Sequence, residues 1–203
     1  MLLKGIVFGF VLAAIVGPMW VLCFRRTIEQ GVATGIASGL GIAVADAIYG
    51  AIAAFGLTAI SGFLLAHSFW IGLAGVAFLA WLGVKALVAR PADLAVVPNG
   101  LASRSLGAAF ASTLTLTLAN PPTILAFTAM LAGLGLAAGA NYQSAALIVA
   151  GVFAGSAAWW LILVAGAAAL RARLSTRLLR AINIVSGVTI LAFAAWQLAA
   201  LIG

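Results

Sequence analysis

The sequence predicts an all-α integral membrane protein with six transmembrane helices. Of its 203 residues, 66% are hydrophobic and only 6% are charged, whereas a soluble domain has roughly 25% charged residues. So few charges cannot cover a water-exposed surface, which excludes a soluble enzyme, a nucleic-acid-binding module and a disordered chain. The apolar runs are continuous rather than alternating, which favours helices over the strands of a β-barrel.

Each predicted span is an apolar run bounded by charged or turn residues. A helix needs about 20 such residues to cross a hydrocarbon core of roughly 30 Å. The six runs lie at 5–24, 32–60, 68–89, 105–133, 142–169 and 182–202. The first follows Lys4, as in a signal peptide, but it continues to Phe24 without a convincing small-residue cleavage site, so we expect it to remain as a span.

Positive charges are distributed unevenly between these spans. Nine of the ten Lys and Arg residues lie on or beside the first, third and fifth connections, and only Lys4 does not. The nine are Arg25, Arg26, Lys85, Arg90, Arg104, Arg171, Arg173, Arg177 and Arg180. The positive-inside rule therefore predicts that the odd connections are cytoplasmic and that both termini are outside.

The polar connection at 90–104 divides the chain into the halves 1–89 and 105–203. With two prolines and an Asn-Gly pair, it is typical of a linker. Three segments of the first half recur in order in the second: 16–18 in 119–121, 41–46 in 151–156, and 75–80 in 187–192. Because each half has three spans, the second half must insert upside down, which predicts a 3+3 inverted repeat. Generic similarity between apolar sequences is the alternative.

Prolines interrupt the first and fourth spans at corresponding places, so these two helices are predicted to be broken. Pro18, Pro121 and Pro122 each remove a backbone hydrogen bond to the residue four positions earlier. The carbonyl groups released in this way are those of Ala14, Thr117 and Leu118. Such carbonyls could hold an ammonium group, and the helix resuming after the break could hold a carboxylate, so an amino acid suits both ends. The alternative is that the prolines only kink the helices.

Asp46 is the only acidic residue well inside a predicted span. A carboxylate at the bilayer centre costs roughly 2.5 kcal/mol or more, so it normally faces the protein interior or a wet cavity. Because burial disfavours its charged form, Asp46 is a candidate proton-coupling residue. The alternative is a neutral carboxyl with a structural role. Its helix carries Gly31, Gly35 and Gly39, a stripe of small residues that permits close helix contact.

Thr113, Thr117 and Asn120 form a polar stripe that leads to the second break. These side chains could bind substrate or could join helices to one another. The predicted substrate-binding set is Gly17, Pro18, Thr113, Thr117, Asn120, Pro121 and Ser156. The one cysteine, Cys23, cannot form an internal disulfide, and no metal-ligand or catalytic motif is present, so neither a metal, a cofactor nor an enzymatic activity is expected.

Four segments carry a resemblance to the LysE/RhtB-type amino-acid exporters of prokaryotic inner membranes. They are Gly17-Pro18, the run RRTIEQGVATGIASGLG at 25–41, FLAWLGVK at 78–85 and TLANP at 117–121. The resemblance implies a six-helix carrier that exports amino acids or close analogues, driven by the proton gradient. The chain has Val16 and Met19 around Gly17-Pro18 where the family has a proline and an acid, and Pro122 where a lysine is common.

The sequence thus predicts a secondary transporter whose partners are an amino-acid substrate and the lipid bilayer, without nucleic acid. An efflux carrier for another small solute, such as a metal ion or a drug, is one alternative, and a non-transporting membrane scaffold is another. The oligomeric state is left open, and it includes a homo-oligomer.

Overall fold

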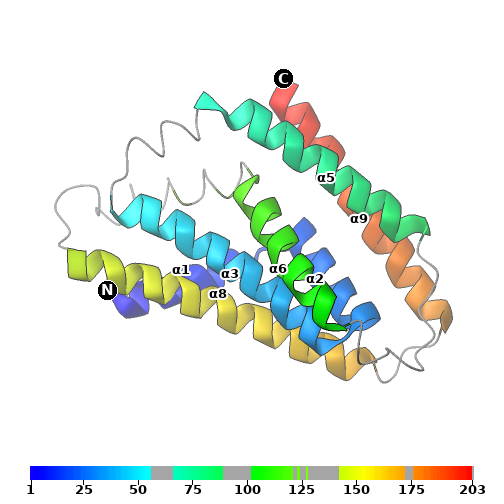
Figure 1. Ribbon diagram of the computed structural model, residues 1–203, viewed down its shortest axis with the longest axis horizontal. Helices are drawn as coiled ribbons and strands as arrows, with labels where there is room; N and C mark the ends of the chain where they lie inside the picture. The colour runs from blue at the N-terminus through cyan, green and yellow to red at the C-terminus, as the bar shows by residue number, and fades with distance from the viewer. Residues whose placement is uncertain are drawn as a thin grey trace.

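The computed structural model describes residues 1–55, 66–88, 102–120, 123, 127, 142–171 and 176–202. Within this part of the chain, all regular structure is helical. The helices are α1 (Leu2–Ala14), α2 (Pro18–Gln30), α3 (Val32–Ala54), α5 (Ser68–Val88), α6 (Ala102–Leu118), α8 (Tyr142–Arg171) and α9 (Thr176–Ile202), as Figure 1 shows. The ends of the predicted spans 32–60 and 105–133, and most of the predicted linker, lie outside the described residues.

Several of these helices are suited to a bilayer. Four of them, α3, α5, α8 and α9, are long and apolar enough to cross a membrane. The pair α1 and α2 meets the same test only when taken together, across a bend of 79°. Helix α6 contributes a shorter apolar stretch, Leu106–Leu118. The chain is therefore a multi-pass membrane protein, and the described residues contain four or five of the six predicted crossings.

The first span is broken where the sequence predicts it. Helix α1 ends at Ala14, and α2 begins at Pro18 after an extended Gly17. Proline suits this position because its fixed φ is compatible with the first helical turn and its missing N–H would have no intrahelical partner there. Helix α2 continues to Gln30, beyond the predicted end of the span at Phe24.

That extension places Arg25 inside a helix rather than in a free connection. Its side chain is only 8% exposed and forms an ion pair with Glu29 at 2.9 Å. Arg25 Nε also donates to Asn183 Oδ1 of α9 at 3.2 Å. The positive charge of Arg25 thus forms contacts within the protein, in addition to any effect it has on membrane topology.

Arg26 joins α2 to two further helices. Its guanidinium donates to the hydroxyl of Ser38 on α3 at 3.1 Å, to the Ala109 carbonyl at 3.1 Å and to the hydroxyl of Ser112 at 2.9 Å, both on α6. The planar, always charged guanidinium suits several fixed acceptors at once. After this helix, Gly31 makes the turn into α3 with φ of 99°, a conformation that favours glycine.

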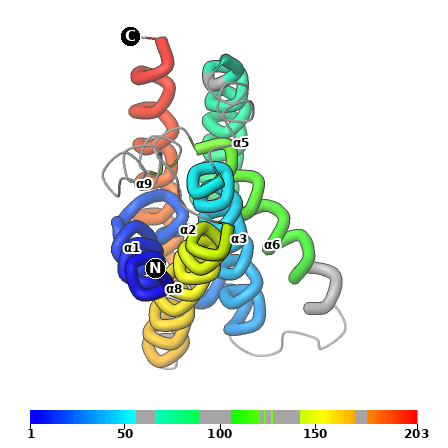
Figure 2. Tube along the Cα trace, turned by 90° about the vertical axis from the view of Figure 1, so that its left-hand side faces the viewer, coloured from blue at the N-terminus to red at the C-terminus, as the bar shows by residue number. Residues whose placement is uncertain are grey.

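The helices pack in pairs that join distant parts of the chain. Helix α1 lies along α8, α3 lies between α8 and α6, and α5 lies beside α9 (Figures 1 and 2). The two halves predicted from the sequence are therefore intertwined, because α1 contacts a helix of the second half and α6 contacts a helix of the first.

Glycine makes the contact between α1 and α8 close. A Cβ atom on Gly155 would collide with the backbone carbonyl of Ile6, and one on Gly151 would collide with that of Leu2. Without a side chain, the two backbones can approach to direct contact, as small residues allow in membranes. Gly41 does the same for α3 and α6, since its Cβ would meet the Phe110 carbonyl.

We expect Gly155→Val to loosen α1 from α8, because the branched side chain has no space beside the Ile6 carbonyl. Overpacking of this kind costs about 1–3 kcal/mol, which should appear as a lower midpoint of thermal unfolding in detergent. Gly166→Val is the matched control on the same helix, since nothing lies within 4 Å of its Cβ position. Equal midpoints for the two variants would contradict this packing.

Candidate functional site

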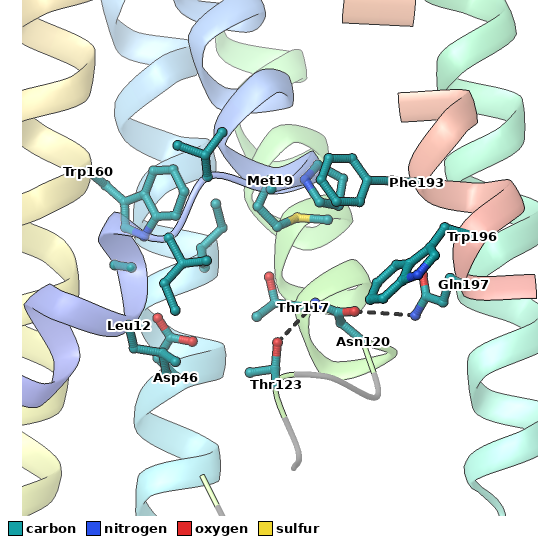
Figure 3. Close-up of a pocket in the computed structure, with 16 residues that line it drawn as sticks. Leu12, Met19, Asp46, Thr117, Asn120, Thr123, Trp160, Phe193, Trp196 and Gln197 are labelled. Carbon is teal, nitrogen blue, oxygen red and sulfur yellow. Dashed lines mark hydrogen bonds between the residues drawn. The ribbon is translucent and has the colours of Figure 1, made fainter. Parts of the chain in front are cut away.

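A cavity of about 290 Å³ lies at the α1–α2 break. Its lining comes from α1, α2, α3, α6, α8 and α9, from the break between α1 and α2, and from Asn120 and Thr123 after α6, so both halves of the chain contribute to it. The volume is near the lower limit of the ligand pockets of proteins, roughly 300 Å³. Figure 3 shows the cavity with the carboxyl group of Asp46 on one side and α9 on the other. The space suits one small molecule.

Asp46 contributes a buried carboxyl group to this lining. Its side chain is 3% exposed, and it accepts a hydrogen bond of 2.7 Å from the Ser156 hydroxyl of α8. No basic side chain lies among the lining residues that the structure describes. A charge on Asp46 therefore has one hydroxyl as its partner, so a cation or a proton bound there would relieve an unpaired buried charge.

The start of α2 supplies the opposite polarity. Gly17, Pro18 and Met19 all line the cavity, and Gly17 has no side chain that could cap the helix. The first backbone bond of this turn runs from the Val21 N–H to the Gly17 carbonyl at 3.2 Å. The N–H groups of Met19 and Trp20 precede it, so the helix has free donors and the positive end of its dipole at the cavity.

A polar group from α6 forms a third part of the lining. Asn120 donates to the hydroxyl of Thr123 at 3.0 Å and accepts from the Gln197 amide of α9 at 3.2 Å (Figure 3). These bonds fix the amide of Asn120 at the point where α6 ends. Thr117, one turn earlier, also lines the cavity, and its buried hydroxyl has no hydrogen-bond partner among the described residues.

The remaining members of the predicted substrate-binding set lie elsewhere. Thr113 is fully buried between α6 and α3, where its hydroxyl donates to the Ser38 carbonyl at 2.8 Å, and it does not line the cavity. Ser156 reaches the cavity only through its bond to Asp46. Pro121 lies outside the described residues. The structure therefore brings together Gly17, Pro18, Asp46, Thr117 and Asn120.

The carbonyl groups at the second break are already used. The Leu118 carbonyl accepts a hydrogen bond from the Tyr49 hydroxyl, and the Thr117 carbonyl accepts from the Asn120 N–H at 3.2 Å. The expectation that these carbonyls could hold an ammonium group is thus weakened, since each has a protein donor. Asp46 is the stronger acceptor in the cavity because it carries a full charge when ionised.

Sequence reasoning missed the aromatic part of the lining. Trp160, Phe193 and Trp196 all border the cavity, and so does Gln197, but none of the four belongs to the predicted substrate-binding set. An aromatic residue in an apolar helix carries no signal of which way it faces, so only the repeat alignment could have drawn attention to this part of α9.

Comparison with known proteins identifies the family. The chain matches the family described as LysE type translocator over residues 10–200. The chain belongs to the LysE family of translocators. It is also similar to a protein of Bacillus subtilis (strain 168) named "Putative amino acid efflux protein YcgF", with 29% identity over 197 residues that cover 94% of this chain and 91% of that protein. No solved structure matches the chain.

Family membership confirms the resemblance predicted from the sequence. Members of this family are translocators, so the chain is a membrane transporter rather than an enzyme. The match includes the α1–α2 break, Asp46 and the end of α6, which all lie within residues 10–200.

We expect Val16→Cys and Asn120→Cys to be joined by a short bifunctional thiol reagent, because both positions border the same cavity. The native Cys23 is fully buried and should not react. Gly107→Cys replaces Asn120→Cys in the control pair, since Gly107 lies on α6 about 16 Å before the end of that helix at Leu118, which Asn120 follows. Cross-linking is read as a mobility shift after cleavage of the chain between the two cysteines. A stronger cross-link in the control pair would contradict the shared cavity.

Proposed function

We propose that this LysE-family translocator exports amino acids or close analogues across the prokaryotic inner membrane by proton antiport. The observation that carries the proposal is the opposed polarity of the cavity, with the Asp46 carboxyl on α3 and the open N-terminus of α2 in the same lining. A zwitterionic amino acid has an ammonium group for the first and a carboxylate for the second. The name of the relative from Bacillus subtilis agrees with this substrate class.

Asp46 would act as the proton-coupling residue because one carboxyl cannot hold a proton and pair with an ammonium group at the same time. A proton taken up from the outer side would release the bound amino acid there. Loss of that proton to the cytoplasm would restore the charge that attracts the next substrate. In this scheme, Ser156 orients the carboxyl through its 2.7 Å hydrogen bond.

The predicted inverted repeat of 1–89 and 105–203 fits this scheme and has support in the packing. Asp46 and Ser156 occupy matching positions of the two halves, and they are hydrogen-bonded to each other. Residues related by a two-fold axis meet in this way when they lie close to the axis. Gly41 and Gly151 also match, and each accommodates a helix from the opposite half, α6 and α1 respectively.

A metal-ion carrier has less support than an amino-acid carrier. Among the described residues there is no group of three or more His, Cys, Asp or Glu side chains that could hold a metal ion. The cavity offers one carboxylate with amides and hydroxyls, which is a weak ligand set for a transition metal.

We expect an epitope tag placed after Gly203 to be accessible from outside intact cells, because the charged odd connections would remain in the cytoplasm. The measurement is labelling of the tag in spheroplasts, before and after permeabilisation. A tag inserted in the polar connection near Asn99 is the matched control, and it should be labelled only after permeabilisation. The reverse pattern would contradict the proposed orientation.

We expect Asp46→Asn to abolish uphill transport and to weaken substrate binding, because the variant can neither carry a proton nor pair with the ammonium group. A pH gradient of one unit is worth about 1.4 kcal/mol per proton, which supports about a tenfold substrate ratio. In sealed vesicles the wild type should approach that ratio, and the variant should stay near a ratio of one. Counterflow of labelled amino acid should require a higher substrate concentration in the variant, because asparagine keeps the size and a hydrogen bond to Ser156 but lacks the charge that pairs with the ammonium group.

Asp93→Asn serves as the control, since Asp93 belongs to the polar connection rather than to a span, and it should transport like the wild type. Proton-driven accumulation by Asp46→Asn vesicles at the wild-type rate, with the same pH dependence, would show that Asp46 is structural.

A further inference from the structure

Two buried polar atoms of the cavity residues have no partner in the described part of the chain. They are the indole nitrogen of Trp160 and the hydroxyl oxygen of Thr117, whose side chains are 3% and 2% exposed. Buried polar groups in folded proteins are almost always hydrogen-bonded, so unpartnered atoms on residues of a cavity lining are candidate contacts for a ligand. Figure 3 places Trp160 on the same side of the cavity as Asp46, and Thr117 nearer its centre.

The two atoms complement the backbone of an amino acid. The Trp160 N–H can only donate, which suits a carboxylate, and the Thr117 hydroxyl can accept from an ammonium group. Together with Asp46 and the first turn of α2, they supply two groups for each end of the zwitterion. These four groups of the cavity then bind the α-ammonium and α-carboxylate groups, which all amino acids share.

A charged substrate side chain would have no counter-ion in this cavity. Asp46 carries the only ionisable side chain among the described lining residues, and the α-ammonium group takes it. Residues 56–65 and 121–141, which complete the connections after α3 and α6, contain no charged residue either. A lysine or glutamate side chain would therefore be buried as an unpaired charge, which is strongly unfavourable.

An uncharged polar side chain of a substrate would also find few hydrogen-bond partners in the cavity. Asn120, Thr123 and Gln197 are already hydrogen-bonded to one another. The part of the lining away from Asp46 also has apolar groups, Met19 from α2 and the rings of Phe193 and Trp196 from α9 (Figure 3). Apolar and aromatic surface of this kind binds a substrate side chain by removing it from water.

We propose that the cavity selects neutral amino acids with a large apolar side chain, whose backbone is bound by Trp160 and Thr117 and whose side chain lies against Met19, Phe193 and Trp196. This selectivity rests on the proposed function as an amino-acid exporter.

The test is counterflow in proteoliposomes that contain the wild-type protein, with labelled L-leucine, L-phenylalanine, glycine, L-lysine and L-glutamate supplied separately. Leucine and phenylalanine should exchange at least about tenfold faster than the other three, a ratio that corresponds to about 1.4 kcal/mol. Exchange of lysine, glutamate or glycine as fast as leucine would overturn the selectivity and leave the exporter function intact. No exchange of any of the five would overturn both.

Two neighbouring tryptophans give a matched pair of variants. Both Trp159 and Trp160 have a buried indole nitrogen that finds no partner among the described residues. Only Trp160 lines the cavity, whereas Trp159 packs on Phe10. Trp160→Phe should raise the KM for leucine about tenfold, since it removes a hydrogen bond to a charged group. Trp159→Phe should leave the KM within about twofold of the wild type. Equal KM values for the two variants would overturn the role of Trp160.

The side-chain contact is tested separately by Phe193→Ala. This variant should lower exchange of phenylalanine more than exchange of leucine, because the larger substrate loses more apolar contact. Both activities should be measured on the same preparation, so that a loss of folded protein lowers them equally and their ratio reports selectivity. An unchanged ratio at wild-type total activity would overturn the proposed position of the substrate side chain.

Discussion

The architecture depends on the need to satisfy the backbone around a helix that is broken within an apolar environment. Irregular backbone at membrane depth is tolerated only where protein covers it or where it lines a water-filled cavity. The break between Ala14 and Pro18 meets the second condition, because Ile15, Val16 and Gly17 line the cavity. At the end of α6, the Tyr49 hydroxyl donates a hydrogen bond to the Leu118 carbonyl. The fold and the cavity therefore follow from one constraint, since the helices packed around the broken backbone also line the cavity.

Close packing of helix backbones stabilises the contacts between helices, which burial of apolar side chains cannot do in lipid. The hydrophobic effect gives little preference for helix contact in a membrane, where lipid tails are as apolar as leucine. Glycines at the crossings allow direct contact of α1 with α8 and of α3 with α6. The few buried polar residues then fix which surfaces meet, as Arg26 does for α2, α3 and α6. The arrangement of the helices is thus determined both by the fit of their surfaces and by a small number of hydrogen bonds.

Much of the fold could be predicted from the sequence because hydropathy and proline act locally. The crossings α5, α8 and α9, the break at Gly17-Pro18 and the burial of Asp46 follow from run length, a missing N–H and the cost of a charge in lipid. The rotation of each helix about its axis could not be predicted in the same way. Thr113 and Thr117 lie one turn apart, yet one bonds to α3 and the other faces the cavity. Trp159 and Trp160 are adjacent, yet only one lines it. Which of two nearby residues faces the cavity depends on tertiary contacts, and these cannot be read from the sequence of a single helix.

The arginine bonds of α2 have a mechanical consequence for a transporter. Helix α2 begins at the cavity with Pro18 and carries Arg26 about 12 Å further along its axis. A motion that moved α2 away from α3 and α6 would have to break the bonds of Arg26. Three hydrogen bonds of one guanidinium would then be lost together, and Arg25 would also have to release Asn183 on α9. In the state described here, Arg25 and Arg26 therefore tie the helix that begins at the cavity to three other helices of the bundle.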